Sequence, residues 1–242
     1  MNTEMYRLFA AVQQQHWWFV ARKHIVLTTI ARHFRPSGKS SVLDIGCGAG
    51  LMLNALQQYG ETSGMDNAET AIEICREVFP GEVRLGYLPD QVPFPRTAFH
   101  LVTALDVIEH IDDDIESLKS IHALLAPGGM AVITVPAYMF LWSEFDEINE
   151  HKRRYTRQEL TTKLGAAGFK IEQMSYFNTL LFPLAWAVRM RNRWLGRSGA
   201  AELELPHKWL NRTLASIFGF EKHLLGFMSL PFGVSLLAVV RR

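Results

Sequence analysis

The chain has 242 residues, of which 48% are hydrophobic and 20% charged, and its formal net charge is +1. This composition is ordinary for a globular protein, and the length allows one domain or two. The small net charge gives no general attraction to nucleic acid or to an anionic membrane, so we expect no nucleic-acid partner. Two cysteines, Cys47 and Cys75, offer neither a disulfide framework nor metal-ligand spacing, and we therefore expect a reduced, cytoplasmic protein without a bound metal.

Neither a signal peptide nor a transmembrane segment is expected. The most apolar stretch, residues 179–188, contains Pro183 and is about half of the roughly 20 residues that a membrane-spanning helix needs. The N-terminal residues contain no continuous apolar run of the kind that a signal peptide carries.

Residues 4–34 have apolar side chains at a period near 3.6, which predicts an N-terminal helix that ends at the RPSG segment of residues 35–38. Beyond it, strand and helix patterns alternate. We predict strands at 42–45, 62–65, 83–85, 101–105 and 130–135, and helices at about 49–58, 68–77 and 112–125. The APGG segment of residues 126–129 is expected to end a helix and to lead into the next strand. This alternation indicates a parallel sheet that is covered by helices on both faces.

The C-terminal part has a different pattern. Thr156 and Glu159 have capping-box spacing, which predicts a helix to about residue 166. Residues 169–177 alternate as a strand, and residues 233–242 read as its antiparallel hairpin partner. The segment between them, 180–228, is predicted to be an irregular helical insertion over the carboxyl ends of the strands, where open α/β sheets bind ligands.

The most informative motif is VLDIGCGAG at residues 42–50. A strand stops beside Asp44, and Gly46, Gly48 and Gly50 let backbone lie directly against a ligand. The dinucleotide fingerprint has the spacing G-x-G-x-x-G, and Leu51 stands where its third glycine would be. The turn suits an adenosyl ligand with a cationic amino-acid tail better than a pyrophosphate.

Four segments carry a family resemblance: VLDIGCGAG, GMDNAE, FHLVTALDVIEHI and LLAPGGMAVITVP, in this order between about residues 40 and 136. They are similar to the successive motifs of class I S-adenosylmethionine (SAM) dependent methyltransferases, with a looser likeness through HKRRYTRQEL. The resemblance implies a Rossmann-like three-layer sandwich with a seven-stranded, mostly parallel sheet whose last strand is antiparallel. It also implies one methyltransferase domain over residues 1–242. Within it we expect a helical lid (1–35), a SAM-binding core (36–136) and an acceptor-side region (137–242).

The resemblance assigns the cofactor residues. Asp44 would face the ammonium end of SAM, and Asp66 would accept hydrogen bonds from both ribose hydroxyls. Arg22 would lie near the SAM carboxylate, and Leu88 would contact adenine. The SAM-binding residues that we expect are Arg22, Asp44, Gly46, Cys47, Gly48, Asp66, Asn67, Leu88, Asp106 and Val107. The alternatives are ordinary ones: Asp44 as a carboxylate that complements a helix dipole, Asp66 as an exposed turn residue and Asp106 as a cap.

The acceptor side is assigned from the segment after the fifth strand. An alcohol or phenol acceptor needs a base near neutral pH, for which histidine is best matched, and His151 is our candidate. Arg154 could grip an anionic acceptor, and Tyr155 completes the predicted catalytic group; a salt-bridged loop is the alternative. Substrate contacts are expected from Trp17, Trp18 and His110, although aromatic core packing and a structural histidine would explain them equally.

Four arginines, interleaved with aromatic and apolar residues, follow the apolar run: Arg189, Arg191, Arg193 and Arg197. An interfacial amphipathic helix and a solvated basic face have the same pattern, so a lipid-like acceptor and peripheral membrane contact stay open. The leading prediction is SAM-dependent O- or N-methylation of a small molecule. The alternatives are an NAD(P)-binding oxidoreductase or epimerase, and a SAM-binding module without catalysis. The sequence does not predict the oligomeric state.

Overall fold

The computed structural model describes residue 7, residues 11–195 and residues 205–242. In these residues, seven strands form one sheet in the order β3-β2-β1-β4-β5-β7-β6. The strands are β1 (Ser41–Ile45), β2 (Glu61–Asp66), β3 (Glu82–Leu85), β4 (Phe99–Leu105), β5 (Leu125–Pro136), β6 (Lys170–Phe177) and β7 (Ser235–Arg241). Strands β1 to β5 pair in parallel, and β7 is antiparallel to both β5 and β6. The predicted Rossmann-like sheet with an antiparallel last strand is confirmed.

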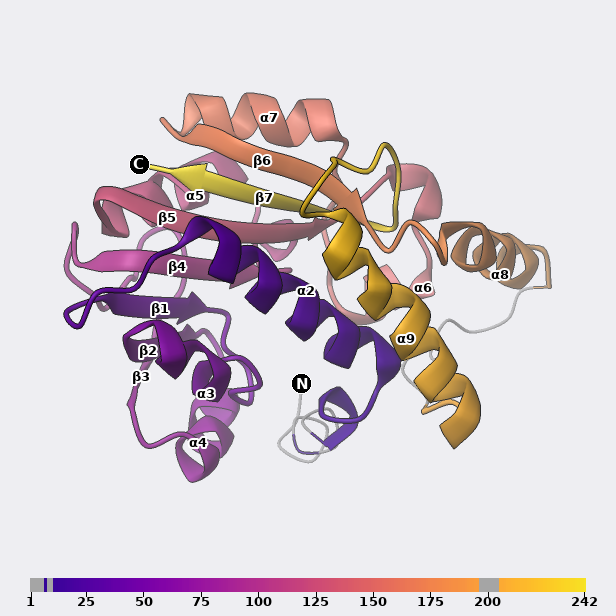
Figure 1. The fold of residues 1–242 in the computed structure, drawn as a ribbon, viewed down its shortest axis with the longest axis horizontal. Coiled ribbons are helices and arrows are strands. Elements are labelled where there is room, and N and C mark those ends of the chain that lie inside the picture. Colours follow the sequence, from indigo (N-terminus) through magenta and orange to yellow (C-terminus); the bar gives the residue numbers. More distant parts are fainter. Residues whose placement is uncertain (1–6, 8–10, 196–204) are drawn as a thin grey trace.

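The described helices lie on both faces of the sheet, so that helices, sheet and helices form three layers (Figure 1). They are α2 (Trp17–His33), α3 (Leu53–Leu56), α4 (Glu69–Val78), α5 (Asp114–Leu124), α6 (Glu144–Ile148), α7 (Arg157–Ala166), α8 (Phe182–Leu195) and α9 (Lys208–Leu224). Helices α2 and α9 share one hydrophobic core with one face of the sheet, and α5 and α7 share a second core with the other face. Neighbouring residues of a strand therefore enter different cores: Val42 lies in the first, and Leu43 lies in the second.

The sequence predicts one continuous helix over residues 4–34, and the structure differs. Residues 1–6, 8, 9 and 10 lie outside the described part. Helical structure is interrupted before α2, where His16 is the extended N-cap and its Nδ1 accepts a hydrogen bond from the Trp18 backbone N–H. The Trp17 N–H donates at 2.8 Å to the side chain of Asn211 on α9. The helix start thus depends partly on a residue far away in the sequence.

Two further local predictions differ from the structure. The APGG segment does not separate a helix from a strand, because β5 already begins at Leu125 and passes through it with a register shift opposite Phe99–Leu101. The helix expected at 49–58 is only the short α3 followed by a 3-10 turn. The capping box at Thr156 and Glu159 is present as predicted, at the start of α7.

The helical insertion between the last two strands is confirmed as α8 and α9. Helix α9 packs along α2, and Figure 1 shows both in front of the sheet. Of the helices in the described residues, none combines the length and the apolar character that crossing a membrane would require.

Candidate active site

A cavity of about 590 Å³ lies at the carboxyl ends of β1 and β4, enclosed by α2, α8 and the loop that precedes α7. This volume is in the range of small-molecule and cofactor sites. Of the sequence-predicted residues, eleven line it: Trp17, Trp18, Arg22, Asp44, Gly46, Cys47, Gly48, Asp106, His110, His151 and Arg154. The cavity lies where the carboxyl edge of an open α/β sheet binds ligands.

The glycine turn after β1 forms one end of the cavity. The N–H groups of Gly46 and Cys47 both donate to the carbonyl of Met65, which fixes the turn against β2. Gly46 has a φ of +69°, and a Cβ there would come 2.5 Å from Cγ2 of Val107. Gly48 has a φ of +52°, and a Cβ there would meet nothing within 4 Å. The turn therefore needs glycine for its conformation and leaves open space beside Gly48 for a ligand.

Asp44 faces the cavity from the end of β1 and is only 3% exposed. Its Oδ1 accepts a hydrogen bond from Oγ1 of Thr103 at 2.5 Å. Burial raises the pKa of this carboxyl to about 7, against the opposing effect of the Thr103 hydrogen bond. A cationic ligand group in the same cavity would stabilise the ionised form of this buried carboxyl.

Asp66 at the end of β2 organises the same turn. One carboxylate oxygen accepts from the Gly48 N–H at 2.8 Å and the other from the Ala68 N–H at 3.0 Å. Burial raises the pKa of Asp66, and these backbone donors oppose the rise. Each oxygen keeps a lone pair with which it can accept a hydroxyl hydrogen.

Four predicted cofactor residues lie outside the cavity lining: Asp66, Asn67, Leu88 and Val107. Asn67 is exposed just beyond Asp66, and Leu88 is buried in the core at 4% exposure. Val107 packs against the glycine turn, where it fills the space that a Cβ on Gly46 would need. The structure therefore gives Val107 and Leu88 packing positions, and it does not bring Asn67 into the cavity.

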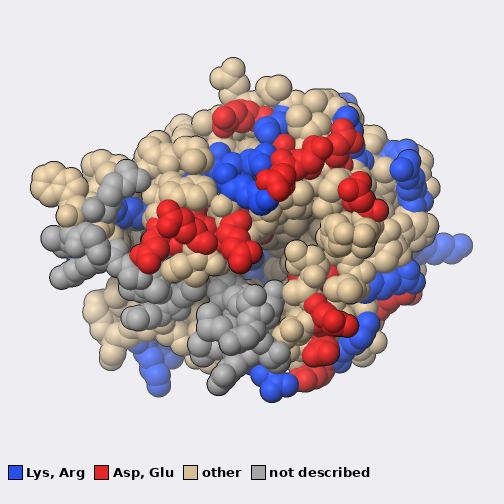
Figure 2. Space-filling model, turned by 180° about the vertical axis from the view of Figure 1, so that it is seen from behind, with Lys and Arg blue, Asp and Glu red and all other residues tan. Residues whose placement is uncertain are grey.

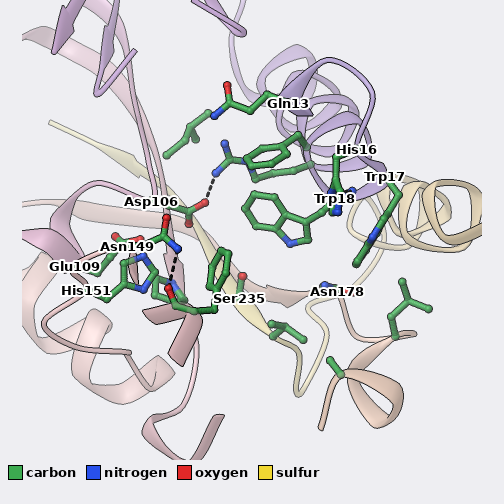
Figure 3. Close-up of a pocket in the computed structure, with 18 of the residues that line it drawn as sticks. Gln13, His16, Trp17, Trp18, Asp106, Glu109, Asn149, His151, Asn178 and Ser235 are labelled. Atoms are coloured by element: carbon green, nitrogen blue, oxygen red, sulfur yellow. Dashed lines mark hydrogen bonds and ion pairs between the residues drawn. The ribbon is translucent and has the colours of Figure 1, made fainter. Parts of the chain in front are cut away.

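Arg22 joins the N-terminal helix to the sheet across the cavity. Its Nη1 forms an ion pair with Oδ2 of Asp106, which follows β4, and its guanidinium lies 4.6 Å from the ring centroid of Trp18. Oδ1 of Asp106 accepts from Oγ1 of Thr134 at 3.0 Å. Trp18 projects from α2 towards Asp106 in Figure 3. Arg22 and Trp18 thus close the cavity on the α2 side.

Three further polar side chains of the cavity wall lie close together: Glu109, His110 and His151. Donor atoms of all three lie within 4.8 Å of one another, and the two imidazole rings meet edge to face with centroids 4.7 Å apart. Glu109 is fully buried, and neither of its carboxyl oxygens has a hydrogen-bond partner among the described residues. Burial, followed by the nearby charge of Asp106, raises the pKa of Glu109 well above its ordinary value. This cluster offers polar atoms to a substrate group, and one ligand atom from each of the three residues could also coordinate a divalent cation.

His151 is held by Asp146, a buried residue of α6. Nδ1 of His151 lies 2.8 Å from Oδ1 of Asp146, and the His151 N–H donates to the Asp146 carbonyl. Burial of Asp146 is outweighed by the hydrogen bond from His151 and the charge of Arg154, which lower the pKa of Asp146 to about 2. An ionised carboxylate only accepts, so Nδ1 carries a hydrogen, and in a neutral imidazole the lone pair is then on Nε2.

Arg154 and Tyr155 use polar groups in contacts within the protein. The Arg154 guanidinium contacts both oxygens of Asp146, at 2.8 and 3.0 Å, and donates to the carbonyl of Ala137. Tyr155 is 1% exposed, lies outside the cavity lining and donates its hydroxyl hydrogen to Asp114. These contacts agree in part with the alternative of a salt-bridged loop. Arg154 forms part of the wall of the site, and Tyr155 belongs to the core.

The predicted arginine patch also takes a different form. Arg189 is 8% exposed, lines the cavity and donates to the carbonyl of Leu141. Arg191 is exposed at the edge of the cavity, while the side chains of Arg193 and Arg197 lie outside those described. The two tryptophans both line the cavity, and Trp17 also packs edge to face on Phe218 of α9.

The sequence reasoning missed several polar residues of the cavity wall, which Figure 3 labels: Gln13, His16, Asn149, Asn178 and Ser235. Asn178 is the most notable, because it is 2% exposed and its Oδ1 has no hydrogen-bond partner among the described residues. It follows β6 with a positive φ of 55°. An asparagine after a strand is a common turn signal, so the sequence gave no reason to single it out.

Comparison with known proteins identifies the family of the chain. A family model described as a methyltransferase domain matches residues 15–174, well over half of the chain. A Mycolicibacterium smegmatis protein named as an S-adenosylmethionine-dependent methyltransferase is 28% identical over 170 residues, which are 69% of this chain and 64% of the relative. The ubiquinone biosynthesis O-methyltransferase of Coxiella burnetii is 29% identical over 128 residues, 48% of this chain and 54% of the relative. The matches thus span between half and two thirds of the length of these curated relatives.

Among solved structures, a Haloferax volcanii methyltransferase in complex with the Trm112 methyltransferase activator superposes with a TM-score of 0.65. The two chains are 18% identical, and the match covers 96% of this chain and 92% of the other. A likeness at this identity shows the fold. The sheet order and the glycine turn define a Rossmann-like methyltransferase domain, and the chain belongs to the class I SAM-dependent methyltransferase family.

Proposed function

We propose that the protein transfers the methyl group of SAM to an oxygen or nitrogen atom of a small-molecule acceptor. The observation that carries this proposal is the presence of two unlike groups in one cavity. A glycine turn with the buried carboxyl of Asp44 lines it, and so does His151, which Asp146 holds. The first group suits a nucleoside with a cationic tail, and the second suits a nucleophile that must lose a proton.

The residues at the turn fit SAM. The open space at Gly48 admits a ligand against the backbone, Asp44 would face the ammonium group, and Asp66 would accept hydrogen bonds from the ribose hydroxyls. Arg22 would exchange part of its ion pair with Asp106 for the SAM carboxylate. When bound, SAM supplies a methyl group on a positively charged sulfur, which needs no further activation.

The work left to the protein is orientation and proton removal. For a hydroxyl acceptor, Nε2 of His151 accepts the proton, while Asp146 fixes the tautomer and stabilises the imidazolium that forms. The carboxyl oxygens of Glu109 and Oδ1 of Asn178, which have no hydrogen-bond partner among the described residues, would bind polar groups of the acceptor. Arg154 is a positioning residue in this scheme, because it holds Asp146.

The O-methyltransferase among the relatives favours an oxygen acceptor, and the apolar wall from α8 is consistent with an apolar tail on that acceptor. A cytoplasmic location and the division of the chain at residues 35 and 136 stay predictions of the sequence.

The test is transfer of a radiolabelled methyl group from SAM to a small-molecule extract, with and without a chelator. We expect labelled product from the wild-type protein and a strong loss with His151→Ala. Binding of SAM with no labelled product in any extract would contradict the proposal and favour a non-catalytic SAM-binding module. If chelation abolishes labelling, the assignment of His151 as the base is wrong, and a cation held by the Glu109 cluster activates the acceptor instead.

A further inference from the structure

The helices α8 and α9 lie beyond the family match, which ends at residue 174. They therefore lie outside the segment that the family model describes. Both carry large apolar side chains on the outside of the molecule. Trp194 is 92% exposed, Trp209 64% and Phe220 54%. Exposed apolar patches of this kind mark interaction surfaces in globular proteins.

The exposed apolar residues of α9 form one stripe. Trp209, Ile217 and Phe220 are spaced at eight and three residues, which places them on the same side of the helix. The other side packs on α2, with Phe218 fully buried. The loop after α9 extends the stripe with Phe227 and Met228, which are 89% and 57% exposed. We call Trp209, Leu210, Ile217, Phe220, Phe227 and Met228 the α9 apolar face.

The charges around this face are basic. Lys208 and Arg212 are exposed on α9, and Lys222 lies near its end. The one acidic residue within α9, Glu221, is fully buried and accepts a hydrogen bond from the Leu180 N–H at 2.8 Å. On the face of the molecule seen from behind, acidic and basic side chains lie beside each other (Figure 2). The net charge of the whole chain is only +1, so the excess of basic side chains on α9 is a local feature.

The same two helices form part of the cavity wall. Val188 of α8 and Leu214 of α9 line the cavity, and Leu184 both lines the cavity and is 53% exposed. Leu184 thus belongs both to the outer surface of the helical insertion and to the wall of the site.

We propose that the α9 apolar face docks on the surface of an anionic lipid bilayer. Tryptophan and phenylalanine would enter the interface, and the flanking lysine and arginine would meet the lipid headgroups. An apolar surface for a second copy of the chain would not need a basic border, since two such borders would repel each other. The charge pattern therefore favours the bilayer over self-association.

Flotation with lipid vesicles tests this proposal without any methyl acceptor. The purified chain is mixed with vesicles of phosphatidylcholine alone or with phosphatidylcholine and phosphatidylglycerol at a 3:1 ratio. We expect binding to the anionic vesicles that weakens as salt is added. Lys208→Glu with Arg212→Glu should reduce this binding at least tenfold, because each basic residue near an anionic surface contributes about fivefold. Trp209→Ser with Phe220→Ser should reduce binding to a similar extent.

Val78→Ser is the matched control, since Val78 is 49% exposed on α4, away from the insertion. It should bind vesicles as the wild type does. Calorimetric titration of every variant with SAM shows whether each is folded, and it separates failure of docking from failure of the proposed function. The proposal is overturned if the wild type ignores anionic vesicles. It is also overturned if the serine pair binds them as well as the wild type does. Light scattering that shows a dimer which the serine pair disrupts would assign the face to a second copy instead.

Discussion

The buried carboxyl of Asp44 makes the affinity for SAM depend on pH. Its pKa is raised to about 7 by burial, so the carboxyl is largely protonated at pH 6 and largely ionised at pH 8. A cationic ligand beside it binds the ionised form better. The affinity should therefore rise with pH, by about tenfold between pH 6 and pH 8, because the ionised fraction grows from about one tenth to about nine tenths.

Calorimetric titration with SAM at pH 6, 7 and 8 measures this rise. At pH 7, titrations in two buffers of different ionisation enthalpy should show release of about half a proton on binding. Asp44→Asn cannot ionise, so it should bind SAM more weakly at pH 8 and lose the pH dependence. SAM has titrating groups of its own, but their contribution is the same for both proteins and cancels in the comparison.

Asp90→Asn is the control, since Asp90 is an exposed carboxylate outside the cavity. This variant should keep the full pH dependence. If wild type and Asp44→Asn respond to pH identically, Asp44 does not face the cationic part of the ligand, and the assignment of this end of the cavity fails.

Three further outcomes are expected. Asp66→Ala should weaken SAM binding at least tenfold in the calorimeter, because two charge-assisted hydrogen bonds to ribose are lost; unchanged affinity would refute the ribose assignment. His151→Ala should leave the SAM affinity unchanged while lowering kcat with an oxygen acceptor by about 10²- to 10⁴-fold in a labelled-methyl assay; wild-type turnover would make the residue structural. Gly46→Ala should lower the free energy of unfolding in denaturant by about 1–3 kcal/mol, because a Cβ there meets Val107 and the backbone has a positive φ. Gly38→Ala, with nothing within 4 Å of the added Cβ, is its control, and equal stability of the two variants would contradict the steric argument.

The sheet and the glycine end of the site could be predicted because their signals are local. The short apolar runs set the strands, and the spacing of Gly46, Gly48 and Gly50 set the turn. The capping box at Thr156 likewise depends on residues three positions apart, and α7 begins there.

The acceptor end could be predicted only in part, because its side chains choose partners that are distant in sequence. Tyr155 and Arg154 are neighbours of His151 in the chain, yet Tyr155 turns to Asp114 and Arg154 to Asp146. Likewise, the start of α2 depends on Asn211, nearly two hundred residues away. Glu109 lies in the turn after β4, buried and without a hydrogen-bond partner among the described residues. Its burial depends on the tertiary packing of this turn. Sequence spacing does not encode these contacts.

The glycine turn and the two buried aspartates are proposed to bind a nucleoside with a sulfonium tail. Calorimetric titration of the wild-type chain with SAM, with its demethylated product and with NAD tests this proposal. We expect saturable binding of the first two and none of NAD. Tight binding of NAD with no heat from SAM would contradict it.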